Sequence, residues 1–283
     1  MNLYKEFPKS IIIEPTVNCN RSCYYCPRVH LNGKDGYMKM ELFRKLMNEI
    51  SKFSGRTVYL FRRGESLLHP EIINMFRYAR PRVEDIQLTT NATLLTPEMS
   101  DELINLLDFI SFSIDIPEKY TSNRGGDYNT VLRNVEYFLS KANGVSVQVS
   151  MVRTNEHTEE DIEQFMNFWK GRVERVRVYD LHSADGKYGS LSYNRGKRQT
   201  CMKPFSEILI YWDGSTGRCN HDWDGERLGD VNKQTIQEVW YSEPYRQLRQ
   251  QHETLELTDN TCKTCNSWYP TFKEQGTGLV IKE

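Results

Sequence analysis

The sequence predicts an α/β protein, a partial (β/α)6 TIM-like barrel followed by a small α+β domain. Six short β-branched runs alternate with amphipathic stretches, an order typical of parallel strands joined by right-handed helical crossovers. The alternation ends after about Leu181, where glycines, polar residues and scattered cysteines follow. Six units are fewer than the eight of a closed barrel. We therefore expect an open barrel over residues 1–198 and a second domain over 199–283.

Each expected strand is a short run rich in Ile, Val, Thr or Phe, and these runs occupy residues 10–14, 57–61, 85–90, 109–114, 146–151 and 175–179. The expected helices repeat apolar residues every three or four positions, over 40–51, 70–79, 97–107, 129–143 and 159–170. Thr96 and Thr158 stand at helix starts, since each hydroxyl precedes a proline or an acidic first turn. In the second domain, Asp213-Gly214 predicts a hairpin turn and 235–240 a short helix.

The composition argues against several classes of function. The net charge of −1 and the mean hydropathy of −0.65 give no electrostatic signature of a nucleic-acid partner. No apolar stretch reaches the ~20 residues of a membrane span, and the first residues lack the hydrophobic core of an export signal. We therefore expect the seven cysteines to be reduced thiols or metal ligands in the cytoplasm, rather than disulfides.

Cys19, Cys23 and Cys26 form a CxxxCxxC array directly after the first expected strand, at the strand end where barrel chemistry collects. The array offers three thiolates, whereas a [4Fe–4S] cube with full protein ligation takes four. Three would leave one iron open to a small molecule, which turns an electron carrier into a reaction centre. The alternative is a zinc site completed by His30, although structural zinc usually takes four ligands in paired spacing.

The spacing and aromatic filling of this array, which include Tyr25, resemble the radical S-adenosylmethionine (SAM) superfamily. The resemblance implies that SAM chelates the open iron. It also implies that one electron, delivered by a flavodoxin- or ferredoxin-type reductant, lets the cluster cleave SAM to methionine and a 5′-deoxyadenosyl radical. That radical abstracts a hydrogen atom from the substrate, so the cofactor carries the difficult chemistry while the protein supplies positioning.

The segment Arg63-Gly64-Glu65-Ser66 is similar to the Gly-Gly-Glu-Pro motif with which the family contacts the SAM amino group. Gly64 permits close backbone approach, and Glu65 is able to accept hydrogen bonds from an ammonium. Arg63, with Arg62 before it, stands where a small residue is usual, and Ser66 stands where proline is usual. We expect the two arginines either to bind a carboxylate or phosphate of the substrate or to point into solvent.

Further motifs follow in the family's order. Asn91, within Thr-Asn-Ala, resembles the family's Thr-Asn-Gly, and Ser113 and Asp115 resemble its Ser-Leu-Asp segment. Arg124 matches an arginine that commonly pairs with the SAM carboxylate. Each match is weak alone, because a serine or aspartate at a strand end is more often a cap. Their common order adds Asn91, Ser113, Asp115 and Arg124 to the expected cofactor-binding residues.

The cysteines of the second domain, together with the Leu-Gly-Asp-Val and Glu-Val-Trp segments between them, resemble the Twitch (truncated SPASM) extension. This resemblance implies an auxiliary [4Fe–4S] cluster held by Cys201, Cys219, Cys262 and Cys265. With three cysteines for the SAM cluster, none of the seven is left over. The alternative is a four-cysteine structural zinc site, because CxxC joined to distant cysteines is also typical of zinc.

The lack of a spare cysteine disfavours an epimerase that returns a hydrogen atom from a thiol. We expect net oxidation of a small polar substrate (a sugar, aminocyclitol or nucleotide sugar), as in the butirosin aminocyclitol dehydrogenase type that the chain resembles. His182 and Asp185, after the sixth strand, are candidates for the base such an oxidation needs. On the fifth strand, Gln148 is a candidate cofactor-binding residue and Arg153 a candidate catalytic residue.

Three other functions stay open. A peptide maturase would oxidise, cross-link or epimerise a ribosomal peptide. A redox-neutral enzyme would eliminate or decarboxylate a sugar. A zinc-stabilised binding module would carry out no radical chemistry.

Overall fold

The structure is a computed structural model, and it describes residues 6–31, 35–183, 186–191, 196–265, 267–268 and 279–282. One sheet of ten strands runs through the molecule in the order β10-β6-β5-β4-β3-β2-β1-β7-β8-β9. The first six strands are parallel to one another. They are β1 (Ser10–Ile13), β2 (Thr57–Leu60), β3 (Asp85–Thr90), β4 (Phe109–Ser113), β5 (Ser146–Arg153) and β6 (Arg175–Asp180). All six predicted strands are confirmed within a few residues.

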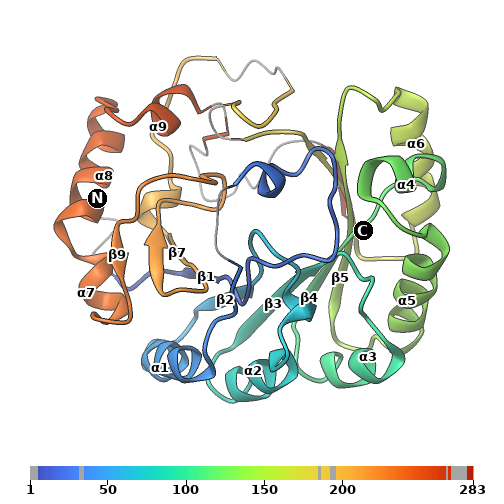
Figure 1. Ribbon diagram of the computed structural model, residues 1–283, viewed down its shortest axis with the longest axis horizontal. Helices are drawn as coiled ribbons and strands as arrows, with labels where there is room; N and C mark the ends of the chain where they lie inside the picture. The colour runs from blue at the N-terminus through green and yellow to red at the C-terminus, as the bar shows by residue number, and fades with distance from the viewer. Residues whose placement is uncertain are drawn as a thin grey trace.

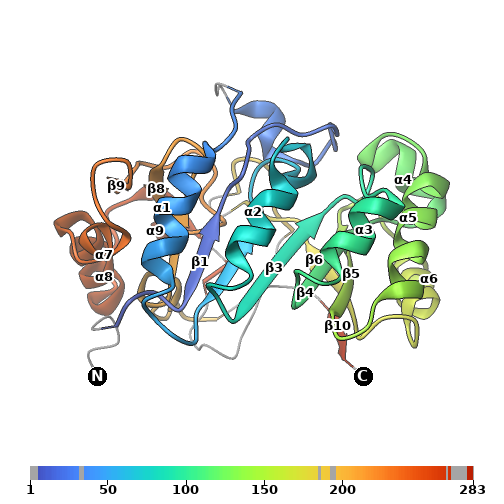
Figure 2. The ribbon, with the colours of Figure 1, turned by 90° about the horizontal axis from the view of Figure 1, so that it is seen from below.

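Helices cover the outer face of this curved sheet (Figure 1). These helices are α1 (Met40–Ile50), α2 (Ile72–Ala79), α3 (Pro97–Leu103), α4 (Pro117–Arg124), α5 (Tyr128–Lys141) and α6 (Glu159–Trp169). Seen from below, α1, α2 and α3 lie across the strands (Figure 2). The predicted caps are confirmed, because the Thr96 and Thr158 hydroxyls accept from the backbone N–H groups of Met99 and Asp161. The sequence prediction missed α4, whose residues are almost all polar.

The C-terminal part extends the same sheet rather than forming one of its own. β7 (Glu207–Ile210) pairs parallel with β1, and the antiparallel β8 (Ser215–Gly217) and β9 (Gly229–Asp230) follow it. The predicted hairpin at Gly214 is confirmed, and its φ of +86° is one that glycine adopts without strain. The remaining elements are α7 (Ile236–Trp240), α8 (Glu243–Thr254), α9 (Asn260–Thr264) and β10 (Leu279–Lys282), which pairs antiparallel with β6. The domain division at 198/199 stays a prediction.

The two faces of the sheet differ in character. Outward residues such as Ile11, Leu88 and Val149 are at most 1% exposed and belong to the main hydrophobic core under the helices. The inner face has a small apolar cluster on β1 and β7, around Ile12 and Leu209, and is polar from β3 to β6. The interior of a closed (β/α)8 barrel is packed with branched apolar side chains, so this polar inner face indicates a space for a ligand. No helix in the described ranges is long and apolar enough to cross a membrane.

Candidate functional site

The loop after β1 carries the first three cysteines above the carboxyl ends of the strands. Cys19 and Cys26 each receive a hydrogen bond from the backbone N–H two residues later, those of Arg21 and Arg28. Such N–H···S bonds are typical of cysteines that hold iron–sulfur clusters, whose potential they tune. Burial raises the pKa of Cys19 to about 11, so its thiol stays protonated until a metal takes the proton's place.

Gly64 lets the loop after β2 lie directly against this cysteine loop. A Cβ at Gly64 would overlap the carbonyl oxygens of Thr16 and Asn18, and the Glu65 N–H donates to the Asn18 carbonyl at 2.8 Å. The close backbone approach expected at Gly64 is therefore made by the segment that precedes Cys19.

The carboxylate of Glu65 is engaged within the protein. Its oxygens accept hydrogen bonds from the Thr90 hydroxyl and the Asn91 N–H at 2.7 Å, and from the Leu67 N–H at 3.1 Å. The residue is 3% exposed, and burial raises its pKa although the three donors oppose the rise. Glu65 thus fixes the ends of β2 and β3 relative to each other. Its contact with a SAM ammonium remains a prediction.

Asn91 links the end of β3 to the cysteine loop. Its Nδ2 donates to Asn20 Oδ1 at 2.9 Å and lies 4.0 Å from the Cys19 sulfur. The next residue, Ala92, has a φ of +58° in the place where the family's motif has glycine, and this left-handed conformation is strained for alanine.

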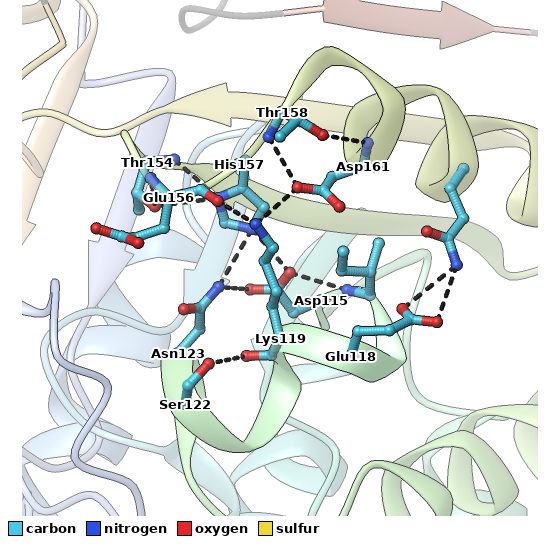
Figure 3. A network of polar contacts seen from close by, with 12 residues as sticks. Asp115, Glu118, Lys119, Ser122, Asn123, Thr154, Glu156, His157, Thr158 and Asp161 are labelled. Carbon is cyan, nitrogen blue, oxygen red and sulfur yellow. Dashed lines mark hydrogen bonds and ion pairs between the residues drawn. The ribbon is translucent and has the colours of Figure 1, made fainter.

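Asp115 and His157 form a buried pair that the sequence prediction missed (Figure 3). His157 Nδ1 accepts from the Thr154 N–H, so its Nε2 carries the proton and donates to Asp115 Oδ1 at 3.0 Å. Asn123 donates to the other carboxylate oxygen at 2.9 Å. The Tyr24 hydroxyl donates to Thr154 at 2.8 Å, which ties this network to the cysteine loop.

Burial raises the pKa of Asp115, but the hydrogen bond from His157 and the charge of Arg124 outweigh it, so the pKa lies below its usual value. This carboxylate therefore stabilises the fold above its unfolded pKa. The contribution is lost as the pH falls through the lowered folded pKa. The sequence spacing of 42 residues between Asp115 and His157 gives no signal of this pair.

Arg124 and Tyr25 leave polar atoms available for a ligand beside the cysteine loop. Arg124 is 5% exposed and its guanidinium lies 5.6 Å from the Tyr25 ring centroid. Among the described residues, neither Arg124 Nε nor the Tyr25 hydroxyl has a hydrogen-bond partner, although both are buried. A buried guanidinium with a free N–H suits a carboxylate, which fits the amino-acid end of SAM. Ser113 lies nearby in the chain as the last residue of β4.

Burial raises the pKa of three C-terminal cysteines, Cys219, Cys262 and Cys265. Nearby cysteines of the same set raise it further, since Cys265 acts on Cys219 and Cys262, and Cys201 acts on Cys265. The Ser267 N–H donates to the Cys265 sulfur at 3.3 Å, which repeats the pattern of the first loop. Burial raises the pKa of Cys219 to about 12. Among the described residues, no group of three or more His, Cys, Asp or Glu side chains is placed to hold a metal ion.

Arg63 is engaged by the protein and also lines a cavity beside the cysteine loop, so its role in binding the substrate stays a prediction. Its guanidinium forms a two-pronged ion pair with Glu14, at 2.7 and 2.8 Å, and lies 4.3 Å from the centroid of Tyr211. Arg62 donates to the Asp222 carbonyl at 2.7 Å and stacks on Trp223. Both arginines therefore connect the barrel to the C-terminal part.

Replacing Arg63 with methionine is expected to lower the free energy of unfolding by about 3–5 kcal/mol, because Glu14 is left as an unpaired buried charge. The Glu14 side chain is 0% exposed and that of Arg63 10%. Urea unfolding followed by circular dichroism measures the change. The control is Arg77→Met. Arg77 forms an ion pair with Glu102, and the two side chains are 53% and 45% exposed. Its loss should lower the free energy of unfolding by less than about 1 kcal/mol. Equal losses in the two variants would contradict the argument.

Two cavities adjoin these groups. One, of about 690 Å³, is lined by residues of the cysteine loop, the loop after β6 and the C-terminal part, including His30, Tyr188 and Trp223. The other, of about 650 Å³, runs along the inner face of the sheet and is lined by Thr89, Gln148 and His182 among others.

The remaining candidates fall in three places. His182 lies in the inner cavity, with its ring centroid 4.4 Å from that of His221. Gln148 stands opposite Arg175 at the start of β6 and lines the inner cavity, and its contact with the cofactor stays a prediction. Arg153 pairs with Asp180 at 2.6 Å and is in neither cavity lining, and its catalytic role stays a prediction. Asp185 lies outside the described residues.

Family models match most of the chain. The model of the radical SAM superfamily matches residues 13–168, and that of an iron–sulfur cluster-binding domain, SPASM, matches residues 201–266. GTP 3′,8-cyclase of Syntrophomonas wolfei is 30% identical over 72% of this chain and 62% of its own length. A cofactor-modifying protein for tungsten-containing aldehyde ferredoxin oxidoreductase, from Pyrococcus furiosus, is 34% identical over 38% of this chain and 31% of its own. The chain thus spans less than two thirds of these curated relatives.

Solved structures share the fold. The complex of BtrN with AdoMet and 2-DOIA has a TM-score of 0.67 and 20% identity, and the match covers 97% of this chain and 99% of that one. Streptococcus suis SuiB bound to S-adenosylmethionine has a TM-score of 0.73 and 14% identity, with 92% and 71% covered. These likenesses confirm the open barrel with its C-terminal extension, and at such identities they bear on the fold alone.

Proposed function

The chain belongs to the radical SAM superfamily, and from this premise we propose that it oxidises a small polar substrate such as a sugar, an aminocyclitol or a nucleotide sugar. Its cofactors are SAM, a SAM-binding [4Fe–4S] cluster and an auxiliary [4Fe–4S] cluster. When bound, SAM and its cluster supply a hydrogen-abstracting radical, and the auxiliary cluster supplies an acceptor for one further electron. A flavodoxin- or ferredoxin-type protein would provide the reducing electron.

The candidate residues fall into groups that would hold the two clusters, SAM and the substrate. Cys19, Cys23 and Cys26 would hold the SAM-binding cluster, and Cys201, Cys219, Cys262 and Cys265 the auxiliary one. Arg124 would hold the SAM carboxylate, while Gly64 and Asn91 keep the loops of β2 and β3 against the cysteine loop. His182 lines the inner cavity and is the candidate acceptor for the substrate proton released in the oxidation.

One observation carries the proposal. The inner cavity is lined both by Thr89, next to the β3 end that contacts the first cysteine loop, and by Asn220 and His221, which follow Cys219. A substrate in this space would lie beside neighbours of both groups of cysteines. This supports a reaction in which hydrogen abstraction and electron removal act on the same molecule. Among similar proteins, the BtrN complex contains 2-DOIA, and GTP 3′,8-cyclase bears a small-molecule substrate in its name.

The test is anaerobic reconstitution with iron and sulfide, followed by reduction in the presence of SAM. Formation of 5′-deoxyadenosine is measured across sugars, aminocyclitols, nucleotide sugars and synthetic peptides, in deuterated buffer. Substrate-dependent 5′-deoxyadenosine with a product two hydrogens lighter supports the proposal. Deuterium incorporation without oxidation would instead indicate epimerisation, and turnover of peptides alone would indicate a maturase. A colourless zinc protein that never cleaves SAM would exclude every radical reaction.

Replacing Arg124 with glutamine is expected to weaken SAM binding by about tenfold to a hundredfold, because the charged donor to the SAM carboxylate is lost. Isothermal titration of the reconstituted protein with SAM measures the dissociation constant. The control is Arg133→Gln on the exposed face of α5, which should bind SAM like the wild type. Unchanged affinity in Arg124→Gln would contradict the assignment of the carboxylate to this arginine.

A further inference from the structure

The middle of the first cysteine loop is fastened at two points. Tyr24 lies between Cys23 and Cys26 in the chain. Its backbone N–H donates to the carbonyl of Asn123 at 3.2 Å, and its hydroxyl donates to the hydroxyl of Thr154 at 2.8 Å. The first contact joins the loop to the last turn of α4, and the second joins it to the residue that directly follows β5. Tyr24 is 49% exposed, whereas both partners are at most 3% exposed, so the loop is attached to buried residues of two other segments.

The hydroxyl of Thr154 has all of its hydrogen-bonding positions occupied. A hydroxyl has one proton to donate and two lone pairs that accept. This one accepts from the Tyr24 hydroxyl at 2.8 Å and from the Glu156 N–H at 3.3 Å, so its own proton goes to Nδ1 of His157, 3.0 Å away. The same nitrogen accepts from the Thr154 N–H at 3.1 Å. His157 therefore fixes the direction of the hydroxyl that holds Tyr24.

His157 is held in turn by a buried carboxylate (Figure 3). The side chains of His157 and Asp115 are 0% exposed, and His157 Nε2 donates to Asp115 Oδ1 at 3.0 Å. Asp115 Oδ2 accepts from the side chain of Asn123 at 2.9 Å, and the carbonyl of Asn123 receives the backbone N–H of Tyr24. The contacts thus close a ring that begins and ends at the cysteine loop. In such a buried network each hydrogen bond supports the next.

We propose that His157 is a positioning residue for the cysteine loop that would hold the SAM-binding cluster. Through the Thr154 hydroxyl it holds Tyr24 at the end of β5, and Tyr24 in turn fixes the two cysteines on either side of it. An imidazole suits this place because it accepts at one nitrogen and donates at the other, and so joins a hydroxyl to a carboxylate. The cluster itself belongs to the proposed function, whereas the fastening of the loop does not depend on it.

A fastened loop has a consequence for the reduction of the cluster. It keeps the sulfur atoms in place and limits the water around a cluster bound there, and the potential of an iron–sulfur cluster depends on its exposure to solvent. The reduced cluster carries one more negative charge than the oxidised one, so water stabilises the reduced form more. Release of Tyr24 should therefore raise the midpoint potential of the SAM-binding cluster and leave that of the auxiliary cluster unchanged.

The first measurement uses the whole chain, reduced and without metal, and follows alkylation of each cysteine by iodoacetamide with peptide mass spectrometry. Thr154→Val removes the hydroxyl and keeps the N–H that donates to His157, and Tyr24→Phe removes the other end of the same bond. Each variant should raise the alkylation rate of Cys23 and Cys26 by about fivefold, because a loop that opens transiently exposes them. The C-terminal cysteines are the internal reference and should keep their wild-type rates. The double variant should react no faster than either single one.

Two variants of His157 test the positioning role itself. His157→Leu neither accepts nor donates, and it should raise alkylation at least as much as Thr154→Val. His157→Gln has an amide oxygen that accepts and an amide N–H that donates, so its alkylation rates should stay within about twofold of the wild type. Since His157→Leu also removes the donor to a buried carboxylate, Thr154→Val carries the test if that protein does not fold. Tyr137→Phe removes a hydroxyl that donates to Asp101 at 3.1 Å in an exposed contact, and it is the matched control for Tyr24→Phe.

The second measurement uses the reconstituted protein, in which redox titration followed by electron paramagnetic resonance gives the midpoint potential of each cluster. Thr154→Val should raise the potential of the SAM-binding cluster only. Unchanged alkylation of Cys23 and Cys26, an equal rise at the C-terminal cysteines, additive effects in the double variant or equal shifts of both potentials would overturn the positioning role.

The two proposals fail separately. Alkylation changes as expected, in a protein that forms no 5′-deoxyadenosine, would keep the positioning of the loop and remove the proposed function. An active oxidase whose alkylation pattern does not respond to Thr154→Val would do the reverse.

Discussion

Replacing Cys262 and Cys265 together with alanine is expected to leave SAM cleavage close to the wild-type rate and to lower substrate oxidation by about a hundredfold or more. Cys262 lies in α9 and Cys265 directly follows it, and with both gone only Cys201 and Cys219 remain of the C-terminal set. A [4Fe–4S] cluster is not held by two cysteines. The loop of Cys19, Cys23 and Cys26 takes its contacts from the ends of β2, β3 and α4 instead, so it should be unaffected.

Three measurements check this expectation. Iron content should fall from about eight to about four per chain, 5′-deoxyadenosine should still form, and the oxidised product should disappear. Thr264→Ala, on α9 but outside the ligand set, controls for local damage to the helix. Oxidation that persists in the double variant would refute an obligatory acceptor at these cysteines. Loss of SAM cleavage as well would show that the C-terminal part also supports the SAM site.

The second large effect is expected from Gly64→Ala. The added methyl group overlaps two backbone carbonyls, of Thr16 and Asn18, which cannot move aside as a flexible side chain would. Overpacking of this kind costs about 1–3 kcal/mol, and here the loop that gives way carries Cys19. We expect loss of the SAM-binding cluster and a fall in SAM cleavage of about a hundredfold, since displacement of positioning groups by an ångström has effects of that size.

Gly55→Ala is the matched control for this variant. Gly55 has a φ of +67°, so alanine there strains the backbone, but no atom lies within 4 Å of the added methyl. It should reduce stability modestly and leave SAM cleavage intact. Iron content, SAM affinity and 5′-deoxyadenosine formation distinguish the two variants. A Gly64→Ala protein with normal iron and normal cleavage would show that the two loops separate without consequence.

The barrel could be predicted from the sequence because its strands and helices have strong local patterns of apolar residues. In β6, apolar residues that pack in the core alternate along the chain with residues that line the inner cavity, which is the period-two pattern of a strand. Helix α4 escaped prediction because Tyr120 is its one fully buried apolar residue, and a single residue makes no periodicity. The cysteine sets and the order of the motifs were visible because their spacing is local.

The partners of the charged residues could not be predicted, because they depend on contacts between distant segments. Arg63 and Glu14 are 49 residues apart, and only the parallel pairing of β1 with β2 brings their carboxyl ends together. The same holds for Arg153 and Asp180 at the ends of β5 and β6. The sequence identified these arginines as chemically capable of binding an anion, but their neighbours decide whether they are available.

The pairing of β7 with β1 covers one edge of the barrel. β1 has hydrogen-bonded neighbours on both sides only because β7 runs along it from Glu207 to Ile210. Without the C-terminal part, β1 would be an open edge with unpaired N–H and C=O groups and an uncovered Ile12 beside it. Such edges recruit strands from other molecules and lead to aggregation. The segment that carries the second set of cysteines therefore also removes a site at which the barrel would pair with other strands.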